Sequence, residues 1–313
     1  MRSFRRPLQT PRLKSLCLLI ALFSALLLWT PPSFAQESHD DDDVIHVNTD
    51  LVVLNLTVVD AKGKYVHGLQ RSDFKVLEEG REQAISDFSV EETPFAVAVL
   101  LDTSGSMQNR MTLARSAAVR FLDGLRADDV VAVYHFNTEV VQVQDFSSNR
   151  DLSPVVFGLH AGGMTALNEA ILRAAEALGQ RPEKRRAIVV LSDGANEGSG
   201  TPASKALERA LAVGATIYTV NMASREPGAG PLLGTGALKN FAAKSGGRYV
   251  PVFGGQGLRE AFGGIVEELS NQYTISYRPL NRARDGRWRS IEVKLHTPQI
   301  TVRTRQGYRA PKA

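Results

Sequence analysis

Polar side chains follow an apolar run in the first half of the chain, at the spacing D-x-S-x-S. Residues 95–101 are seven apolar residues without alternation, and Asp102, Ser104 and Ser106 come directly after them. An unbroken apolar run is typical of a strand that is buried on both faces of a parallel sheet. Ligands of open α/β sheets gather at the carboxyl ends of the strands. One carboxylate with several hydroxyls suits a hard divalent cation that keeps some of its waters.

Two other interpretations of this stretch need to be weighed. In the first, it is an ordinary strand-to-helix turn in which Ser104 or Ser106 caps the following helix. In the second, Asp102, Thr103, Ser104 and Gly105 stand for the Asp-Thr-Gly signature of aspartic proteases. Ser104 interrupts that signature, the chain holds no second copy, and the flanking pattern alternates strands and helices. These differences exclude the protease.

The spacing of Asp102, Ser104 and Ser106 resembles the metal-ion-dependent adhesion site of von Willebrand factor type A domains. That resemblance implies a threonine from a second loop and an aspartate from a third. Thr165 meets the first requirement, just before an amphipathic helix, and Asp193 meets the second, just after an apolar strand. All five positions of the pattern are therefore present, in the order that the family shows.

The resemblance also implies how such a site works. Ser104, Ser106 and Thr165 would bind the metal directly, and Asp102 and Asp193 directly or through water. Mg²⁺ is the expected ion, with Mn²⁺ or Ca²⁺ as alternatives, because three hydroxyls and two carboxylates suit an octahedral site of modest negative charge. Few protein charges leave the ion electrophilic, so that it can take an Asp or Glu carboxylate from a partner protein. We therefore predict an exported, metal-dependent protein-binding module that is not an enzyme.

Two other functions stay open. One is a structural or assembly component of a cell-envelope complex, in which the metal only stabilises the loops. The other is a metal-dependent hydrolase, which lacks support because the chain has no P-loop, no G-x-S-x-G and no H-E-x-x-H among its six histidines. His160, shortly before Thr165, is a candidate for the rim of the site, although a surface loop is the more ordinary place for a histidine.

Strands and helices alternate over residues 93–271, which predicts a doubly wound, mostly parallel sheet with helices on both faces. Apolar residues recur at helical spacing over 167–178 and 258–269, and a further helix is expected over 110–125. Thr201 and Pro202 predict the capped start of another helix, and Gly214 its end. Further strands are expected at residues 130–136, 140–143, 187–191, 216–220 and 248–252, the second of these as an antiparallel edge hairpin.

Both flanks of this region alternate with a period of two. Residues 44–92 and 272–310 each contain short apolar/polar strands, and neither flank has enough strands to form a stable sandwich alone. We therefore predict that they pair into one small antiparallel β-sandwich into which the α/β domain is inserted. The flanks also resemble the von Willebrand-related proteins of acidobacteria and similar bacteria. The matching stretches are Gly68-Leu69, Asp73-Phe74, Glu78-Glu79-Gly80, Tyr273-Thr274-Ile275-Ser276-Tyr277 and Arg305-Gln306-Gly307-Tyr308.

The start of the chain predicts export. Residues 1–35 combine a basic start, a short apolar core and a small-residue cleavage signature, as in a signal peptide, with an uncleaved membrane anchor as the alternative. Residues 36–43 form an acidic leader that we expect to be disordered. The excess of 37 basic over 33 acidic residues is due to the five basic residues of the predicted signal peptide, residues 1–35, so it does not indicate nucleic-acid binding. The single cysteine, Cys17, lies there too, so no disulfide is expected in a periplasmic or secreted product.

Two further stretches carry weaker signals. Residues 226–231 are rich in glycine and proline and are interpreted as a surface connection rather than a binding loop. Four arginines lie between two strands of the C-terminal flank and are interpreted as a solvated hairpin loop, with contact to an acidic surface as the alternative. They are Arg282, Arg284, Arg287 and Arg289. The sequence indicates no oligomeric state.

Overall fold

A computed structural model describes residues 51–312, except 91–92, 195, 197, 223–234, 253 and 298. The predicted signal peptide, the acidic leader and the loop 226–231 lie outside the described residues. None of the described helices has the length and apolar character needed to cross a membrane.

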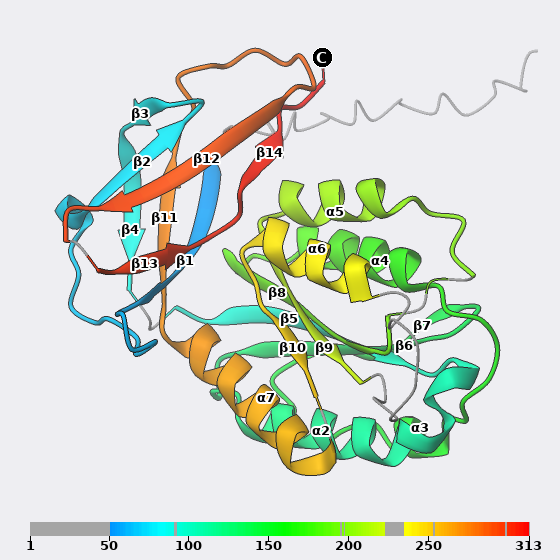
Figure 1. Ribbon diagram of the computed structural model, residues 1–313. Helices are drawn as coiled ribbons and strands as arrows, with labels where there is room; N and C mark the ends of the chain where they lie inside the picture. The colour runs from blue at the N-terminus through cyan, green and yellow to red at the C-terminus, as the bar shows by residue number, and fades with distance from the viewer. Residues whose placement is uncertain are drawn as a thin grey trace, which may run out of the picture. The chain divides into compact units, whose positions relative to one another are not determined.

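A six-stranded sheet forms the centre of the α/β part, in the order β10-β9-β8-β5-β6-β7 (Figure 1). All neighbours are parallel except β6 and β7, which pair as an antiparallel edge hairpin. The predicted doubly wound sheet and its edge hairpin are thus confirmed. The strands are β5 (Phe95–Asp102), β6 (Val130–Phe136), β7 (Val140–Ser147), β8 (Arg185–Ser192), β9 (Ala215–Asn221) and β10 (Tyr249–Pro251).

Helices cover both faces of this sheet (Figure 1). Every residue of β5 is buried, and alternate side chains enter two different cores. Val97 and Val99 pack with α2 and α7, whereas Ala98 and Leu100 pack with α4, α5 and α6. This double burial explains the apolar run without alternation. The helices are α2 (Met111–Asp123), α3 (Val155–Gly158), α4 (Leu167–Gly179), α5 (Ala203–Ala212), α6 (Thr235–Ser245) and α7 (Gly254–Ser270).

The predicted cap of helix α5 is wrong. The helix begins at Ala203, so the residue directly before it is Pro202, whose side chain has no oxygen that can accept a backbone N–H. The hydroxyl of Thr201 instead donates to the Glu169 carboxylate at 2.5 Å, which ties this turn to α4. Gly214, with a φ of +70°, follows the end of the helix as expected.

Two four-stranded antiparallel sheets contain the remaining strands. One has the order β13-β1-β11-β4 and the other β14-β12-β2-β3, so each combines strands from both flanks of the chain. Their facing apolar side chains form a third core, built around residues such as Leu54, Val76 and Tyr273. The strands are β1 (Val52–Val59), β2 (Phe74–Glu78), β3 (Arg81–Gln83), β4 (Ile85–Ser89), β11 (Gln272–Tyr277), β12 (Trp288–Leu295), β13 (Thr301–Arg303) and β14 (Gly307–Arg309).

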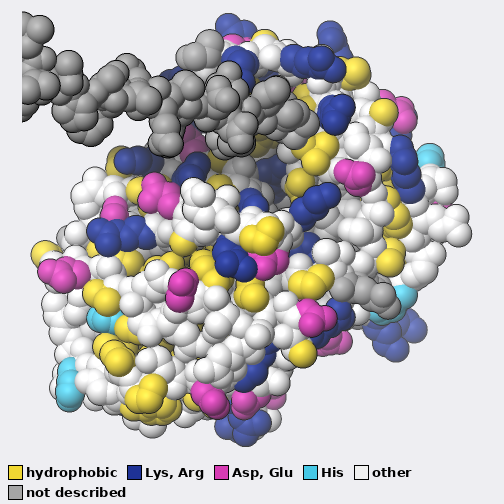
Figure 2. All heavy atoms as spheres, turned by 180° about the vertical axis from the view of Figure 1, so that it is seen from behind, with side chains coloured by type: hydrophobic (Ala, Val, Ile, Leu, Met, Phe, Trp, Pro, Cys, Tyr) yellow, Lys and Arg dark blue, Asp and Glu magenta, His cyan; other side chains and the backbone are white. Residues whose placement is uncertain are grey.

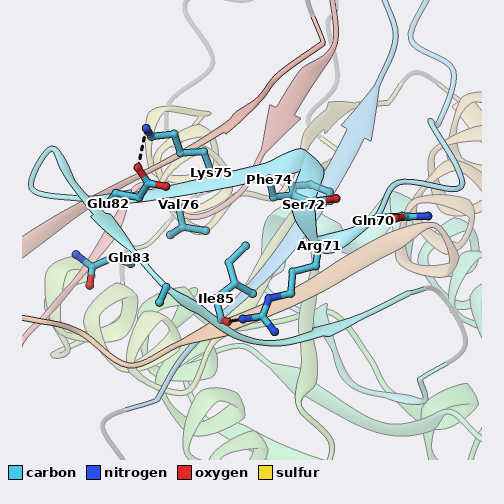
Figure 3. Close-up of a pocket in the computed structure, with 10 residues that line it drawn as sticks. Gln70, Arg71, Ser72, Phe74, Lys75, Val76, Glu82, Gln83 and Ile85 are labelled. Carbon is cyan, nitrogen blue, oxygen red and sulfur yellow. Dashed lines mark hydrogen bonds and ion pairs between the residues drawn. The ribbon is translucent and has the colours of Figure 1, made fainter.

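The chain passes from one of these sheets to the other between β3 and β4, where a shallow pocket of about 490 Å³ lies (Figure 3). Lys75 and Glu82 form an ion pair of 2.7 Å on its rim. The guanidinium of Arg71 donates to the backbone carbonyl of Ile85, an acceptor on the outer strand β4. This bond ties the short turn before β2 to strand β4 of the other sheet.

A buried carboxylate joins α7 to the antiparallel sheets. Glu268 is 1% exposed and accepts hydrogen bonds from the hydroxyls of Thr57, at 3.2 Å, and Tyr218, at 2.9 Å. The guanidinium of Arg303 donates to the same oxygen, and Arg248 lies 3.8 Å from the other. Strands β1, β9 and β13 are thereby fixed to the last turn of α7.

Candidate metal site

Asp102 is the last residue of β5, and its carboxylate is completely buried. One oxygen accepts the backbone N–H of Ser104 at 2.8 Å, and the other accepts the hydroxyl of Ser192 at 2.5 Å. Burial raises the pKa of this carboxyl to about 6, the hydrogen bonds from Ser104 and Ser192 lower it, and the charge of Asp193 raises it. No cation takes part in these interactions among the described residues, so the carboxylate is only partly compensated.

Ser104 and Ser106 follow on the turn after β5. Ser104 precedes the short 3-10 helix η2 (Gly105–Arg110), but its side chain does not cap that helix. Its hydroxyl instead lies 3.1 Å from the hydroxyl of Ser106. The capping interpretation of Ser104 is therefore wrong, because the backbone turns both serine oxygens toward one another.

Thr165 lies on a second loop that is bound to the first. The N–H of Gly105 donates to the Gly163 carbonyl at 3.1 Å, and the N–H of Gly162 donates to the Thr103 carbonyl at 2.9 Å. Gly163 has a φ of +77°, and a Cβ there would lie 2.6 Å from the Thr138 hydroxyl, so only glycine allows this turn. Thr165, at the end of the loop, is 2% exposed.

Asp193 follows the last residue of β8, on the third loop. The hydrogen bond from Ser192 to Asp102 holds this loop against the first, and the N–H of Gly198 donates to the Thr165 carbonyl at 3.1 Å. The three loops that carry the five predicted residues are thus joined by hydrogen bonds at one edge of the sheet.

The guanidinium of Arg110 lies at this edge as well. It is 3.7 Å from the Asp193 carboxylate and donates to the backbone carbonyl of Ser106 at 3.1 Å. Sequence reasoning missed both Arg110 and Ser192. Ser192 could have been found, because it directly precedes Asp193 at a strand end. Nothing in the sequence distinguishes Arg110 from the other arginines of the chain.

Two histidines need to be compared at this edge: His160, the candidate for the rim of the site, and His135. His160 is exposed, and it has no hydrogen-bond partner among the described residues. His135, on β6, lies closer to the motif, since its Nδ1 is 3.2 Å from the hydroxyl of Thr103. That hydroxyl also donates to the Phe136 carbonyl at 3.2 Å, so the Thr103 side chain is engaged with β6 and separate from the two serines.

The donor set fits a hard divalent cation. It contains only carboxylate and hydroxyl oxygens, which Mg²⁺ and Mn²⁺ accept. No group of three or more His, Cys, Asp and Glu side chains occurs together in the described part of the chain, so a site at this edge must depend on its hydroxyls. A buried, uncompensated carboxylate is costly, and a bound cation would remove that cost.

Comparison with known proteins identifies the family of the α/β part. Residues 97–196 match the family model for the von Willebrand factor type A domain, and this range contains all five predicted site residues. Comparison with curated proteins gives no match.

Solved structures resemble the fold. A structure described as von Willebrand factor type A from Catenulispora acidiphila has a TM-score of 0.50 at 14% identity and covers 85% of this chain and 75% of its own. An aerotolerance-related membrane protein from Bacteroides fragilis has a TM-score of 0.44 at 20% identity, covering 56% and 99%. The von Willebrand domain of the type V pili tip protein Mfa5 from Porphyromonas gingivalis has a TM-score of 0.47 at 14% identity, covering 56% and 94%. At these identities the likeness concerns the fold alone.

Proposed function

Since the chain contains a domain of the von Willebrand factor type A family, we propose that it is an exported, metal-dependent protein-binding module. Its ligand would be an Asp or Glu carboxylate of a partner protein. The observation that carries the proposal is the state of Asp102, a completely buried carboxylate that receives hydroxyl and amide donors but no cation among the described residues.

Each side chain has a distinct part in this proposal. Ser104, Ser106 and Thr165 would hold Mg²⁺ through their hydroxyls, and Asp102 and Asp193 would supply its negative charge, directly or through water. Bound there, the ion offers an electrophilic position to an incoming carboxylate.

Other groups of the chain would hold these ligands in place and favour an acidic partner. Ser192 keeps the Asp102 carboxylate in place through its hydrogen bond of 2.5 Å. Arg110, 3.7 Å from Asp193, adds positive charge at the edge of the site and favours an acidic ligand over a neutral one. The oxygens of Ser104 and Ser106 lie 3.1 Å apart, so they need little rearrangement to face one ion.

Catalysis of hydrolysis at this edge of the sheet is less well supported than binding. A hydrolase needs a general base within hydrogen-bond reach of the attacking water. The imidazole of His135, beside the motif, already interacts with the Thr103 hydroxyl through Nδ1. We therefore propose binding without turnover.

The first test is calorimetric titration with Mg²⁺ and Mn²⁺. Wild-type protein should bind a divalent ion saturably, and Thr165→Ala should weaken binding at least about tenfold by removing one ligand oxygen. Thr103→Ala is the matched control, because it removes a hydroxyl from the same region that bonds to β6 instead. An equal loss in both variants, or no binding by folded wild type, would refute the metal assignment.

The second test concerns the partner. Peptides displayed on phage would be selected in Mg²⁺ and eluted with EDTA, and each selected sequence should need an Asp or Glu that Asn or Gln cannot replace. Metal binding that stabilises the fold but selects no acidic peptide would instead support the assembly component.

A further inference from the structure

A second pocket, of about 680 Å³ and open to solvent on one side, lies among the antiparallel strands. Its walls come from the end of β2, from β3, from most of the loop between β11 and β12, and from the first residues of β12 (Figure 1). None of the five predicted metal residues lines it. It therefore belongs to a different part of the chain from the site proposed above.

The loop of this pocket is strongly basic. Residues 278–289 contain five arginines and one acidic residue, Asp285. Figure 2 shows dark blue Lys and Arg side chains along the upper edge of the view. Such a local excess of positive charge raises the concentration of anions near the pocket.

The carboxylates of the pocket are already engaged. Asp285 accepts two hydrogen bonds from Arg289, at 2.9 and 3.0 Å. Glu78 is 2% exposed and accepts the hydroxyls of Tyr277, at 2.7 Å, and Tyr308, at 3.0 Å. Asp285 also lies 3.9 Å from the guanidinium of Arg287. Both carboxylates are therefore engaged, although each keeps lone pairs that can accept a further hydroxyl.

Several guanidinium groups, by contrast, keep unused donors. Within the described part of the chain, the side chains of Arg81 and Arg282 have no hydrogen-bond or ion-pair partner. Arg289 is 4% exposed, and its buried Nε has no acceptor among the described residues. A guanidinium presents its N–H groups as a planar fork that matches the two oxygens of a carboxylate. These donors therefore suit a carboxylate better than the ammonium group of a lysine would.

Two apolar side chains stand beside these charges. Leu280 is 70% exposed and Trp288 39% exposed, and both line the pocket. The indole of Trp288 packs against the backbone of Gly307, where a Cβ would come within 2.6 Å of the ring. Glycine at this position therefore lets the ring approach the sheet closely and stay fixed at the rim.

We propose that this pocket binds a sugar ring that carries a carboxylate, such as a uronic acid unit of an anionic polysaccharide. The carboxylate would pair with Arg81 and Arg282, and an apolar ring face would cover Trp288. The hydroxyls would donate to Asp285 and to the second oxygen of Glu79, a lining residue whose first oxygen already accepts the N–H and the hydroxyl of Ser290. A bare anion would leave Trp288 and Leu280 unused. An acidic peptide would bring more carboxylates against those already present.

The proposal is tested by calorimetric titration of the protein with oligogalacturonate in EDTA, which separates this pocket from the metal site. Wild type should bind saturably, and Arg81→Ala and Arg282→Ala should each weaken binding about tenfold. Arg284→Ala is the matched control, because Arg284 shares the loop but does not line the pocket, and it should change the affinity less than about twofold. Trp288→Ala should weaken binding of the oligomer but leave any binding of acetate unchanged.

Four results would overturn the proposal. Wild type that binds no oligogalacturonate has no such site, and equal binding of neutral galactose oligomers would show that the carboxylate is not recognised. Equal loss in Arg284→Ala would show only diffuse attraction by the basic loop. Equal or tighter binding of polyglutamate or anionic vesicles, with the same dependence on Arg282, would assign the pocket to another class of ligand.

Discussion

Asp102 and Glu268 are both buried carboxylates, 0% and 1% exposed, but their surroundings differ. Glu268 meets the guanidinium of Arg303, lies 3.8 Å from Arg248 and accepts two hydroxyls. Asp102 receives only hydroxyl and backbone donors among the described residues. The charge of Glu268 is compensated by guanidinium groups of the chain itself, whereas the charge of Asp102 would be compensated by the cation that we propose.

This difference indicates different roles for the two carboxylates, one in holding the fold together and one in binding. Removing one partner of a buried ion pair leaves the other uncompensated, so the Glu268 cluster holds α7 to the antiparallel sheets. Leaving a buried carboxylate without a cation lowers stability, and chains retain such costs at functional sites. On this argument Asp102 belongs to the binding site that we propose, and Glu268 holds two parts of the fold together.

The largest effect should follow from Glu268→Ala. This change leaves the guanidinium of Arg303 without its carboxylate and removes the acceptor of Tyr218 and Thr57. We expect the free energy of unfolding, measured in urea, to fall by about 2–3 kcal/mol. Glu268→Gln keeps an acceptor oxygen and should cost less. A loss below about 0.5 kcal/mol for the alanine variant would show that the cluster contributes no more than surface pairs do.

Asp102→Asn should raise the free energy of unfolding of the metal-free protein, whereas Glu268→Ala lowers it. Because the pKa is raised from 3.8 to about 6, the folded state holds this proton more tightly than the unfolded chain does, and stability falls as the pH rises through this window. At pH 7.5 without metal the variant should be more stable than wild type by on the order of 2 kcal/mol. The gain should shrink as the pH falls through 6 and disappear below 3.8, where the folded and the unfolded state are both protonated. A destabilised variant at pH 7.5 in EDTA would contradict the account.

Gly163→Ala tests the turn that places Thr165. The added Cβ meets the Thr138 hydroxyl at 2.6 Å in a backbone conformation that favours glycine, so we expect a loss of about 1–2 kcal/mol and weaker Mg²⁺ binding. Gly162→Ala is the control, because a Cβ there meets nothing within 4 Å. Urea unfolding and calorimetry of both variants would show whether the effect depends on that contact, and equal effects would refute it.

The smallest effect is expected from Arg110→Gln. The guanidinium lies 3.7 Å from the Asp193 carboxylate and repels a second cation there. Mg²⁺ affinity should therefore rise about threefold in calorimetry. Arg120→Gln, on the following helix α2, should leave the affinity unchanged. A weaker affinity in Arg110→Gln would show that Arg110 orients Asp193 instead of competing for it.

Much of the fold could be predicted from the sequence because its signals are local. The unbroken run before Asp102 is buried by two helix layers, and alternation in both flanks gives antiparallel strands. The five candidate metal residues lie at or just after strand ends, or shortly before a helix, where pattern and position coincide. Their metal binding stays a prediction.

The rest depends on contacts between residues far apart in the chain. Thr57 and Glu268 are 211 positions apart, so no sequence window contains the buried cluster. The hydroxyl of Thr201 reaches Glu169 because α4 and α5 lie side by side, which overrides its local preference for capping. The position of Arg110 likewise follows from the approach of Asp193, which lies 83 positions later in the chain, and the sequence contains no sign of this contact.

The most direct test of the central claim is urea unfolding of wild type and Asp102→Asn at pH 7.5, each in EDTA and in saturating Mg²⁺. The account predicts that Mg²⁺ at about one hundred times its dissociation constant stabilises wild type by about 2.7 kcal/mol and leaves the asparagine variant unchanged. Equal stabilisation of both proteins, or of neither, would contradict the claim that a divalent cation completes the charge of Asp102.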